Sequence, residues 1–489
     1  MIPAAALFDL RRARSPLLAL AVVCASPLAA RAAGFELLDN GTRSLSRGGA
    51  FSALADDGSA VALNPGALTR ATGTRLYLSN DFYHAPVTFT RDATSIPVGV
   101  LPPGTDAETA TRPSENKKPW FPIGPMLVLG SDLGLDDWQF AFSFYGPASI
   151  GRHRYDIDAG SRWMLTRMDL SVAYVGASVA WGKSDHYGVG VTLQNAMALD
   201  VKFRQVTDGA NAGPLHPYYG PVDLETEVRL HDYFAPTAIV GAWYRPVERF
   251  EVSLSGRVIP VYFHTTGDVR LHNVPGITVF TPEELAVDDS SASLDLVLPP
   301  TAHLGLRYRH PDGQGGELFD VELDVVYEAW SMFKRYDVKL GGTLNVIVVG
   351  QEVPDIDLEK RWRDTLSLRL GGSWNVIRDR LSLSLGGFWE SGAVPNRYEA
   401  LDFLSFSRFG VAFGARLTVG RFELGAAYAH VFQEDRHTDE AHGQLYQIRP
   451  LDPCPESCDS GAGWSGVPAN AGRFESRFDI LSASVGVAF

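Results

Sequence analysis

The sequence predicts an all-β protein, a transmembrane antiparallel β-barrel of about fourteen strands with an N-terminal hatch that plugs the lumen. Three observations predict this fold class. The 489-residue chain begins with a leader of the export type, continues as alternating apolar and polar segments, and ends in an alternating strand whose last residue is aromatic. The mean hydropathy of −0.04 is too polar for a helical membrane protein. It suits a barrel, in which only alternate residues meet lipid.

The first residues have the three parts of a secretory signal peptide. Arginines at 11–14 form a positive region, residues 17–28 are apolar, and residues 30–32 read Ala-Arg-Ala, a small-residue cleavage site. We therefore expect residues 1–32 to be a signal peptide and the mature protein to begin at Ala33. No later apolar run is long enough to span a membrane as a helix. Export then leaves secretion, the periplasm or the outer membrane as destinations.

Composition narrows the classes of protein further. The formal net charge is −14, and residues 1–32 carry +3, so the mature chain carries about −17. This acidity argues against nucleic acid as a partner. Forty-eight glycines and an aromatic fraction of 11% fit strands, tight turns and interfacial aromatic girdles. Because no linker or change in composition divides the chain, we expect a hatch over residues 33–70 and one barrel over residues 71–489.

The barrel region reads as strands joined alternately by short turns and long polar loops. Short periplasmic turns and long extracellular loops produce this pattern, and bacterial barrels have an even number of strands. The predicted strands are 72–90, 120–132, 137–149, 166–182, 187–206, 226–246, 249–272, 292–310, 317–341, 360–376, 380–394, 406–420, 421–435 and 472–489.

The two faces of a strand follow from the period-two alternation of side chains. In 360–376 we expect the lipid face to carry Trp362, Leu366, Leu368 and Leu370, and the lumenal face to carry Arg361, Arg363, Thr365, Ser367 and Arg369. In 187–206 we expect Val189, Val191, Leu193, Leu199, Val201 and Phe203 to point outward, and Gln194, Asp200, Lys202 and Arg204 to point inward. A soluble β-sandwich remains the alternative at this level.

The last strand alternates up to the final residue. Its apolar positions are Leu481, Ala483, Val485, Val487 and Phe489, and the residues between them are small or polar. An apolar alternating strand that ends on an aromatic residue resembles the signal by which outer-membrane barrels reach their assembly machinery. Phe489 is therefore the predicted assembly signal, although a soluble edge strand can alternate in the same way.

Cleavage would leave two cysteines, Cys454 and Cys458, in a loop rich in Pro and Gly. Two cysteines in an exported chain usually pair, so we expect a structural disulfide. A metal site is the competing interpretation, but it lacks two further ligands at suitable spacing. We expect neither a metal nor a cofactor.

Several motifs resemble one known family. The mature start Ala33-Gly34-Phe35-Glu36-Leu37-Leu38, the segment Arg47-Gly48-Gly49-Ala50 and residues 55–68, which end in Asn64-Pro65-Gly66-Ala67-Leu68, are similar to the hatch of the outer-membrane long-chain fatty-acid transporters. This FadL-type family includes aromatic-hydrocarbon uptake channels. It usually has Asn-Pro-Ala where this chain has Asn-Pro-Gly. We expect the looser backbone of Gly66 to be tolerated there.

Further matches follow in order along nearly the whole mature chain. They include Val326-Tyr327-Glu328-Ala329-Trp330-Ser331, Arg361-Trp362-Arg363-Asp364-Thr365 and the run from Gly386 to Pro395. Residues 401–408 depart from the family pattern, which puts functional detail in that loop in doubt. Each motif alone is weak, but their order along the chain is specific.

The resemblance implies a fourteen-stranded barrel closed by the hatch, with hydrophobic ligands captured by loops, bound in the lumen and released sideways through a kink in the third strand. We expect this kink at Gly146-Pro147, because Pro147 cannot donate to the ladder; an ordinary turn is the alternative. The predicted hatch residues are Phe35, Asn64, Pro65 and Gly66, since the fixed φ of Pro65 and the side chain of Asn64 can hold the hatch against the wall.

The expected function is passive uptake of hydrophobic compounds, with long-chain fatty acids favoured and aromatic hydrocarbons as the alternative. Apolar surface with a few cations would hold an amphipathic anion. The cations predicted to pair with its carboxylate are Arg361, Arg363, Arg369, Lys202 and Arg204. They could equally offset lumenal acidic residues, which we consider the stronger interpretation for any single one.

Other classes of function stay open. A general porin would lack a hatch, an outer-membrane lipase would need a nucleophile and base that no motif displays, and long loops alone suggest an adhesin. We expect no enzyme activity. The expected location is the outer membrane of a Gram-negative bacterium. The expected partners are a hydrophobic small molecule, outer-membrane lipid and lipopolysaccharide, and the barrel assembly machinery, with the protein a monomer.

Overall fold

The computed structural model describes residues 38–92, 111–122, 125–147, 151–207, 223–274, 280–281, 283–344, 351–352, 355–446 and 468–489. The predicted signal peptide, Phe35 and the cysteines Cys454 and Cys458 lie outside the described residues. The pairing of these cysteines therefore stays a prediction.

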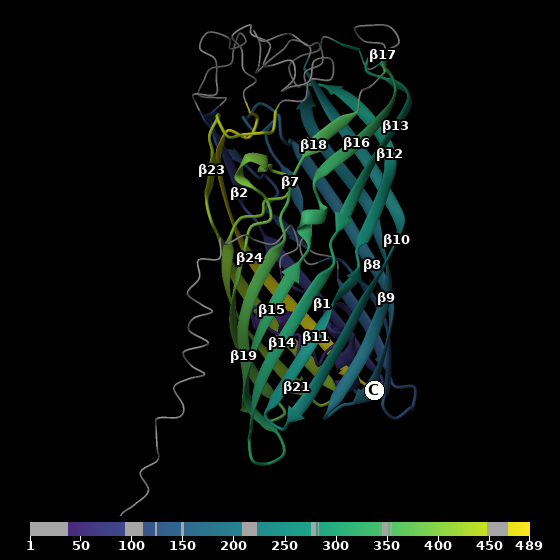
Figure 1. The fold of residues 1–489 in the computed structure, drawn as a ribbon, viewed down its shortest axis with the longest axis vertical. Coiled ribbons are helices and arrows are strands. Elements are labelled where there is room, and N and C mark those ends of the chain that lie inside the picture. The colour runs from purple at the N-terminus through teal and green to yellow at the C-terminus, as the bar shows by residue number, and fades with distance from the viewer. Residues whose placement is uncertain are drawn as a thin grey trace, which may run out of the picture. The chain divides into compact units, whose positions relative to one another are not determined.

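Fourteen antiparallel strands close into a barrel, as the sequence predicts (Figure 1). The ring closes between the first and last strands, where Arg75 pairs with Ala488 and His84 with Asp479. Each of the fourteen predicted strands corresponds to one strand of this ring. The structure adds that several of them are divided into two or three pieces.

The first seven strands are formed, in chain order, by β1 (Arg75–His84) with β2 (Val87–Arg91), β4 (Trp120–Pro122) with β5 (Met126–Ser131), β6 (Trp138–Tyr145) with β7 (Arg152–Arg154), β8 (Arg167–Lys183), β9 (Tyr187–Thr207), β10 (Leu224–Val247), and β11 (Phe250–Ile259) with β12 (Val261–Asn273). A two-residue strand, β3 (Ser114–Glu115), pairs with β2.

The other seven are β13 (Val287–Leu298) with β14 (Thr301–Pro311), β15 (Glu317–Glu328) with β16 (Arg335–Leu344), β17 (Gln351–Glu352), β18 (Ile356–Glu359) and β19 (Thr365–Ile377) as one strand, β20 (Leu381–Glu390), β21 (Arg408–Val419), β22 (Phe422–Gln433) with β23 (Arg436–Thr438), and β24 (Gly472–Ala488). Two short 3₁₀ helices, η3 (Trp330–Met332) and η4 (Asn396–Tyr398), lie in connections.

The alternation of side chains explains why these segments form a barrel wall. In β21, Phe409, Val411 and Phe413 are exposed, whereas Ala412 between them is fully buried. Large apolar side chains thus cover the outer face, and small ones leave room inside. No helix among the described residues is long and apolar enough to cross a membrane.

The predicted hatch segment, residues 33–70, is described from residue 38 onward and contains α2 (Thr42–Ser46), α3 (Ala60–Leu63) and η1 (Pro65–Arg70). α2 contacts β20, β21, β22 and β24, whereas η1 contacts β6, β8, β9 and β10. These contacts reach strands on opposite sides of the ring, and most side chains of the segment are buried. In Figure 1 the segment is drawn in purple among the strands of the lower half.

The face assignment of the fifth strand is correct at first and then wrong. Gln194 is buried as predicted, but a bulge lies at Leu199, because Ser171 pairs with Asp200 and Val172 with Ala198. One extra residue reverses the parity of everything that follows. Phe203 consequently lines an interior cavity, so its predicted outward orientation is wrong. Correspondingly, Asp200 is exposed, Val201 is fully buried, and Lys202 and Arg204 belong to the outer face.

The tenth strand shows the same kind of error at its start. Residues 361–364 are not part of a strand, and Arg361 has a φ of 44°. This backbone turn buries Trp362 and exposes Arg361 and Arg363, which is the reverse of the prediction. From Thr365 onward the prediction holds: Ser367 and Arg369 are buried, while Leu368 and Leu370 are exposed.

Candidate functional site

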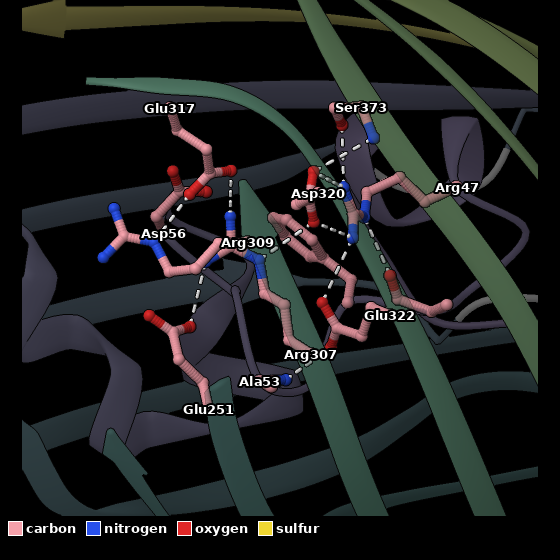
Figure 2. A network of polar contacts seen from close by, with 12 residues as sticks. Arg47, Ala53, Asp56, Glu251, Arg307, Arg309, Glu317, Asp320, Glu322 and Ser373 are labelled. Atoms are coloured by element: carbon pink, nitrogen blue, oxygen red, sulfur yellow. Dashed lines mark hydrogen bonds and ion pairs between the residues drawn. The ribbon is translucent and has the colours of Figure 1, made fainter. Parts of the chain in front are cut away.

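Arg47 anchors the hatch segment to the barrel wall (Figure 2). Its guanidinium is fully buried and makes a bidentate contact with Asp320, at 2.9 and 2.6 Å. It also donates to Glu322 at 3.2 Å, to the hydroxyl of Ser373 at 2.7 Å and to the carbonyl of Ala50 at 2.8 Å. Charge-assisted bidentate pairs of this kind are the strong ones, so this contact fixes the hatch rigidly.

A row of inward carboxylates on β15 receives the neighbouring hatch backbone. Asp320, Glu322 and Asp324 stand at every second position, so all three face the lumen. Glu322 accepts from the Ala53 amide at 2.6 Å, and Asp324 accepts from the amides of Phe51 and Ser52 at 3.1 and 2.9 Å. The wall therefore supplies the acceptors that an irregular buried segment needs for its backbone.

Two further arginines, one on the wall and one on the hatch, join this network of carboxylates. Arg307 donates to Asp320 at 2.9 Å and to Glu251 at 2.9 Å (Figure 2). Arg70 of the hatch donates to the same Glu251 at 2.9 Å and stacks on the ring of Trp243, 3.6 Å from its centroid. Hatch and wall arginines thus alternate around common carboxylates, which holds several strands and the hatch in one network.

Asn64 and Gly66 have close contacts at the junction between hatch and barrel. The Asn64 amide donates to the carbonyls of Ser52 at 2.8 Å and Ala242 at 3.3 Å, and its oxygen accepts from the Gly66 amide at 3.2 Å. A Cβ on Gly66 would lie 2.6 Å from the carbonyl oxygen of Gly241. Gly66 is therefore not a loose point in the backbone; it permits close contact with the wall.

The start of the described hatch lies at the end of β6. The side chain of Asn40 donates to the carbonyl of Gly146 at 2.9 Å, and Asp39 forms an ion pair with Arg369. β6 ends at Tyr145, opposite Tyr174, and neither Gly146 nor Pro147 belongs to a strand; β7 pairs with β8 from Arg152, opposite Asp169. Ladder pairing therefore breaks at Gly146-Pro147, where the sequence analysis placed the kink; its role as an exit stays a prediction.

An apolar cavity of about 90 Å³ is lined by strands five, six and eight to ten, by the segment before the fourth strand, and by the segments after the eleventh and thirteenth strands. Its lining is mostly aliphatic and aromatic. The residues that line it are Trp163, Met164, Leu165, Phe203, Gln205, Thr226, Val228, Leu294, Tyr336, Val338, Leu358, Lys360, Ala400, Asp402, Leu445 and Tyr446. Such a lining suits a hydrophobic ligand.

One buried ion pair interrupts this apolar lining. The ammonium of Lys360 contacts Asp402 at 2.6 Å and lies 4.8 Å from the ring centroid of Tyr336. Asp402 also accepts from the Phe403 amide at 2.9 Å. The charges cancel locally, so the cavity presents polar atoms without a net charge.

A group of aromatic side chains extends from this cavity toward the wall. The ring of Trp362 lies 5.1 Å from Trp330, 4.8 Å from Phe333 and 6.2 Å from Phe403, and Phe333 lies 5.1 Å from Tyr336. We call these five residues the aromatic cluster. All five are at least nine-tenths buried.

The five cations expected to pair with a ligand carboxylate are not brought together. Lys202 and Arg204 face outward, and Arg361 and Arg363 are exposed. Arg369 does lie inside, but its guanidinium already forms an ion pair with Asp39 of the hatch. Sequence reasoning missed Lys360, which directly precedes the predicted Arg361, and Asp402, which lies in the loop that departs from the family pattern.

The remaining predicted residues are placed as follows. Pro65 opens η1 beside Asn64, and the backbone amide of Phe489 donates to Thr74 at 3.0 Å while its side chain is exposed. The role of Phe489 in assembly stays a prediction. Among the described residues, no group of three or more His, Cys, Asp or Glu side chains could hold a metal ion.

Comparison with known proteins places this geometry in context. A family model described as outer membrane protein transport protein (OMPP1/FadL/TodX) matches residues 22–450. No curated protein sequence matches the chain. A solved FadL homologue from Pseudomonas aeruginosa is 17% identical with a TM-score of 0.72, covering 94% of this chain and 100% of its own.

Two solved toluene transporters are also similar in fold. TbuX from Ralstonia pickettii is 12% identical with a TM-score of 0.62, covering 93% of this chain and 100% of its own. TodX from P. putida is 13% identical with a TM-score of 0.62, covering 93% of this chain and 99% of its own. At these identities the likeness extends to the fold alone.

Proposed function

Because the chain belongs to the OMPP1/FadL/TodX family of outer membrane transport proteins, which carry hydrophobic compounds across the outer membrane of Gram-negative bacteria, we propose a route for such a compound through this barrel. Loops capture it, the apolar cavity binds it, and it leaves sideways at the break after Tyr145 in the third strand. The observation that carries this proposal is the apolar cavity itself, since an open aqueous pore offers a hydrophobic compound no favourable binding.

The cavity favours a small uncharged ligand. An engineered apolar cavity of about 150 Å³ in another protein takes up benzene, so a space of about 90 Å³ is on the scale of one ring. Among the described residues that line it, the one ammonium is that of Lys360, which is paired with Asp402. A second negative charge beside this pair would be buried without compensation, which is costly in an apolar site. These two features support an aromatic hydrocarbon as the ligand.

Long-chain fatty acids are the second candidate. Lys360 favours them, because an ammonium has three donors and its hydrogen bond to Asp402 uses one of them. A carboxylate head could bind there if it displaced Asp402 or entered as the neutral acid. The tail would then extend beyond the cavity toward the loops.

Uptake of radiolabelled toluene and oleate, in cells that lack other transporters of this family, separates the two ligands. If the ligand is uncharged, wild type carries toluene faster than oleate, and Lys360→Met changes toluene uptake less than threefold. Asp402→Asn should raise oleate uptake several-fold, because it frees the ammonium. Faster oleate uptake by wild type, lost in Lys360→Met, would select the fatty acid. Arg361→Met, an exposed neighbour, is the matched control for both.

The exit is tested by straightening the third strand. Replacing Gly146-Pro147 by Val-Thr restores a donor and a β-branched side chain, so β6 can continue along β8. We expect uptake to fall strongly while ligand still binds the purified protein. Wild-type uptake by this variant would show that the ligand leaves elsewhere.

A further inference from the structure

The wall between the eighth and ninth strands is interrupted beside the cavity. Toward the loops, the ladder of β13 and β16 runs from Val287 opposite Leu344 to Leu294 opposite Val338 and stops. Toward the turns, the ladder of β14 and β15 starts at Thr301 opposite Glu328. Residues 295–300 and 329–337, all described, form no ladder pair with each other; we call this stretch the seam.

The sequence and the backbone both interrupt the ladder at the seam. Pro299 and Pro300 carry no amide hydrogen, so the eighth strand has two fewer donors at this point. On the other side, the ninth strand turns into η3, and the carbonyl of Lys334 accepts from the amides of Lys360 and Arg361, both at 2.7 Å. The ninth strand therefore bonds to the tenth here. One backbone bond, from Ala329 to Pro300 at 3.2 Å, marks the lower end of the seam.

Side chains close the seam in place of hydrogen bonds. Leu296 and Leu298 from the eighth strand are 8% and 2% exposed, and Phe333 and Trp330 from the ninth are 4% and 0% exposed. Opening a regular ladder inside a membrane would leave amides and carbonyls unpaired, at a cost of several kcal/mol each. Opening the seam would only require rotation of apolar side chains, whose contacts are individually weak.

The seam and the cavity share residues. Leu294 and Val338 form the last ladder pair above the seam, and both line the cavity. Tyr336, also in the lining, belongs to the aromatic cluster that contains Phe333 and Trp330. On the outer surface beside the seam, Tyr327 and Met332 are exposed, at 44% and 41%. Buried apolar side chains therefore lead from the cavity through the aromatic cluster to the seam, whose outer surface also carries the charged side chains of Asp295 and Arg335.

We propose that the seam is a second lateral route, through which an uncharged hydrophobic compound passes from the cavity into the surrounding lipid. This rests on the proposed function, since it takes the cavity as the binding site. It goes beyond that proposal because the seam lies between strands eight and nine, separate from the break in the third strand. A ligand that moves this way stays in contact with apolar side chains until it reaches the outer surface. The third-strand break lies on a different part of the ring.

Cross-linking the seam tests the proposal. Continuing the register of β13 and β16 would place residue 297 opposite residue 335, so Val297→Cys with Arg335→Cys can be joined by a short bismaleimide. The matched control joins Ser293→Cys with Lys339→Cys on the same strands, where the ladder is intact. Both pairs are made with Cys454 and Cys458 replaced by Ser. Toluene uptake in cells and toluene binding to the purified barrel are measured before and after cross-linking.

We expect the cross-linked seam to lower toluene uptake about twofold with binding unchanged, because the third-strand route stays open, while the control pair leaves uptake unchanged. Unchanged uptake with the seam sealed, together with loss of uptake after straightening the third strand, would overturn the second route. If the unmodified barrel neither binds nor carries toluene or oleate, the proposed function fails and the route fails with it. Combining the sealed seam with the Gly146-Pro147→Val-Thr variant should abolish uptake.

Discussion

The hatch region and the cavity region of the same barrel are built on opposite principles. Around the hatch, buried arginines and carboxylates connect the wall to the segment inside, and glycines allow the two backbones to touch. Around the cavity, strands are divided into pieces, and aromatic and aliphatic side chains fill the space between them. The divisions fall at Pro260, at Pro299-Pro300, at 329–334 and at 360–364.

This difference reflects what each region of the interior has to hold. The hatch brings backbone amides and carbonyls into the barrel, and these need fixed partners, so the wall there is polar and complementary. A hydrophobic ligand brings no hydrogen-bonding groups and has to leave again. An apolar lining with few directional contacts suits that task, and broken strands cost less where side chains already close the wall.

The largest effect is expected for Arg47→Ala, which removes the main polar contact between the hatch and the wall. It leaves Asp320 and Glu322 without their shared hatch partner, and breaking a buried pair costs about 4 kcal/mol. We expect release of the hatch, seen as a rise in single-channel conductance and as cleavage of residues 38–70 by added protease. Arg361→Ala, which removes an exposed pair with Glu359, is the control and should change neither.

Trp362→Ala tests the apolar packing of the cavity region in the same way. Removing this buried ring from the aromatic cluster costs about 3 kcal/mol of local stability and enlarges the apolar space. We expect weaker toluene binding, by tenfold or more, with conductance unchanged because no hatch contact is touched. A rise in conductance equal to that of Arg47→Ala would show that the two regions are one cooperative unit.

Gly66→Ala sharpens the comparison at the junction. It introduces the residue usual in the family, yet a Cβ here meets the Gly241 carbonyl at 2.6 Å, so overpacking should cost about 2 kcal/mol. Thermal unfolding and conductance measure the loss. Gly130→Ala, where the nearest atoms lie at 3.6 Å, is the matched control. Equal stability of both variants would contradict the close contact.

Asn64→Asp tests the hydrogen bonds that the Asn64 side chain donates at the junction between hatch and barrel. The carboxylate can still accept from the Gly66 amide, but it cannot donate to the carbonyls of Ser52 and Ala242, and losing such a bond costs about 1 kcal/mol. A small increase in ion leakage is expected. Asn64→Ala, which also leaves the Gly66 amide unpaired, should leak more. Greater leakage in Asn64→Asp would contradict this and assign the effect to the carboxylate introduced at this buried position.

The smallest effect concerns pH. Burial raises the pKa of Asp57 to about 6, from an ordinary value of 3.8, although Arg43 and Ser59 act in the opposite direction. Because the folded form binds the proton more tightly, the contribution of Asp57 to hatch stability is greatest below about pH 4 and is lost as pH rises through 6. Protease cleavage of the hatch should therefore increase between pH 4 and pH 7, and this part of the increase should disappear in Asp57→Asn.

The sequence by itself determined the fold class, the fourteen strands and the position at which the third strand stops. Apolar and polar side chains must alternate wherever a wall separates lipid from a lumen, and this requirement acts on each strand locally. It therefore remains readable in the chain, as in Phe409, Val411 and Phe413 of β21.

Only the tertiary structure decided which charges face inward and where the cavity lies. A single bulge at Leu199 reversed the parity of Lys202 and Arg204, and one turn of backbone at Arg361 exchanged the sides of Trp362 and its neighbours. The pair of Lys360 and Asp402 joins residues 42 positions apart through a lumenal loop. Bulges, divided strands and contacts between distant segments depend on the registers of adjacent strands, which local alternation does not encode.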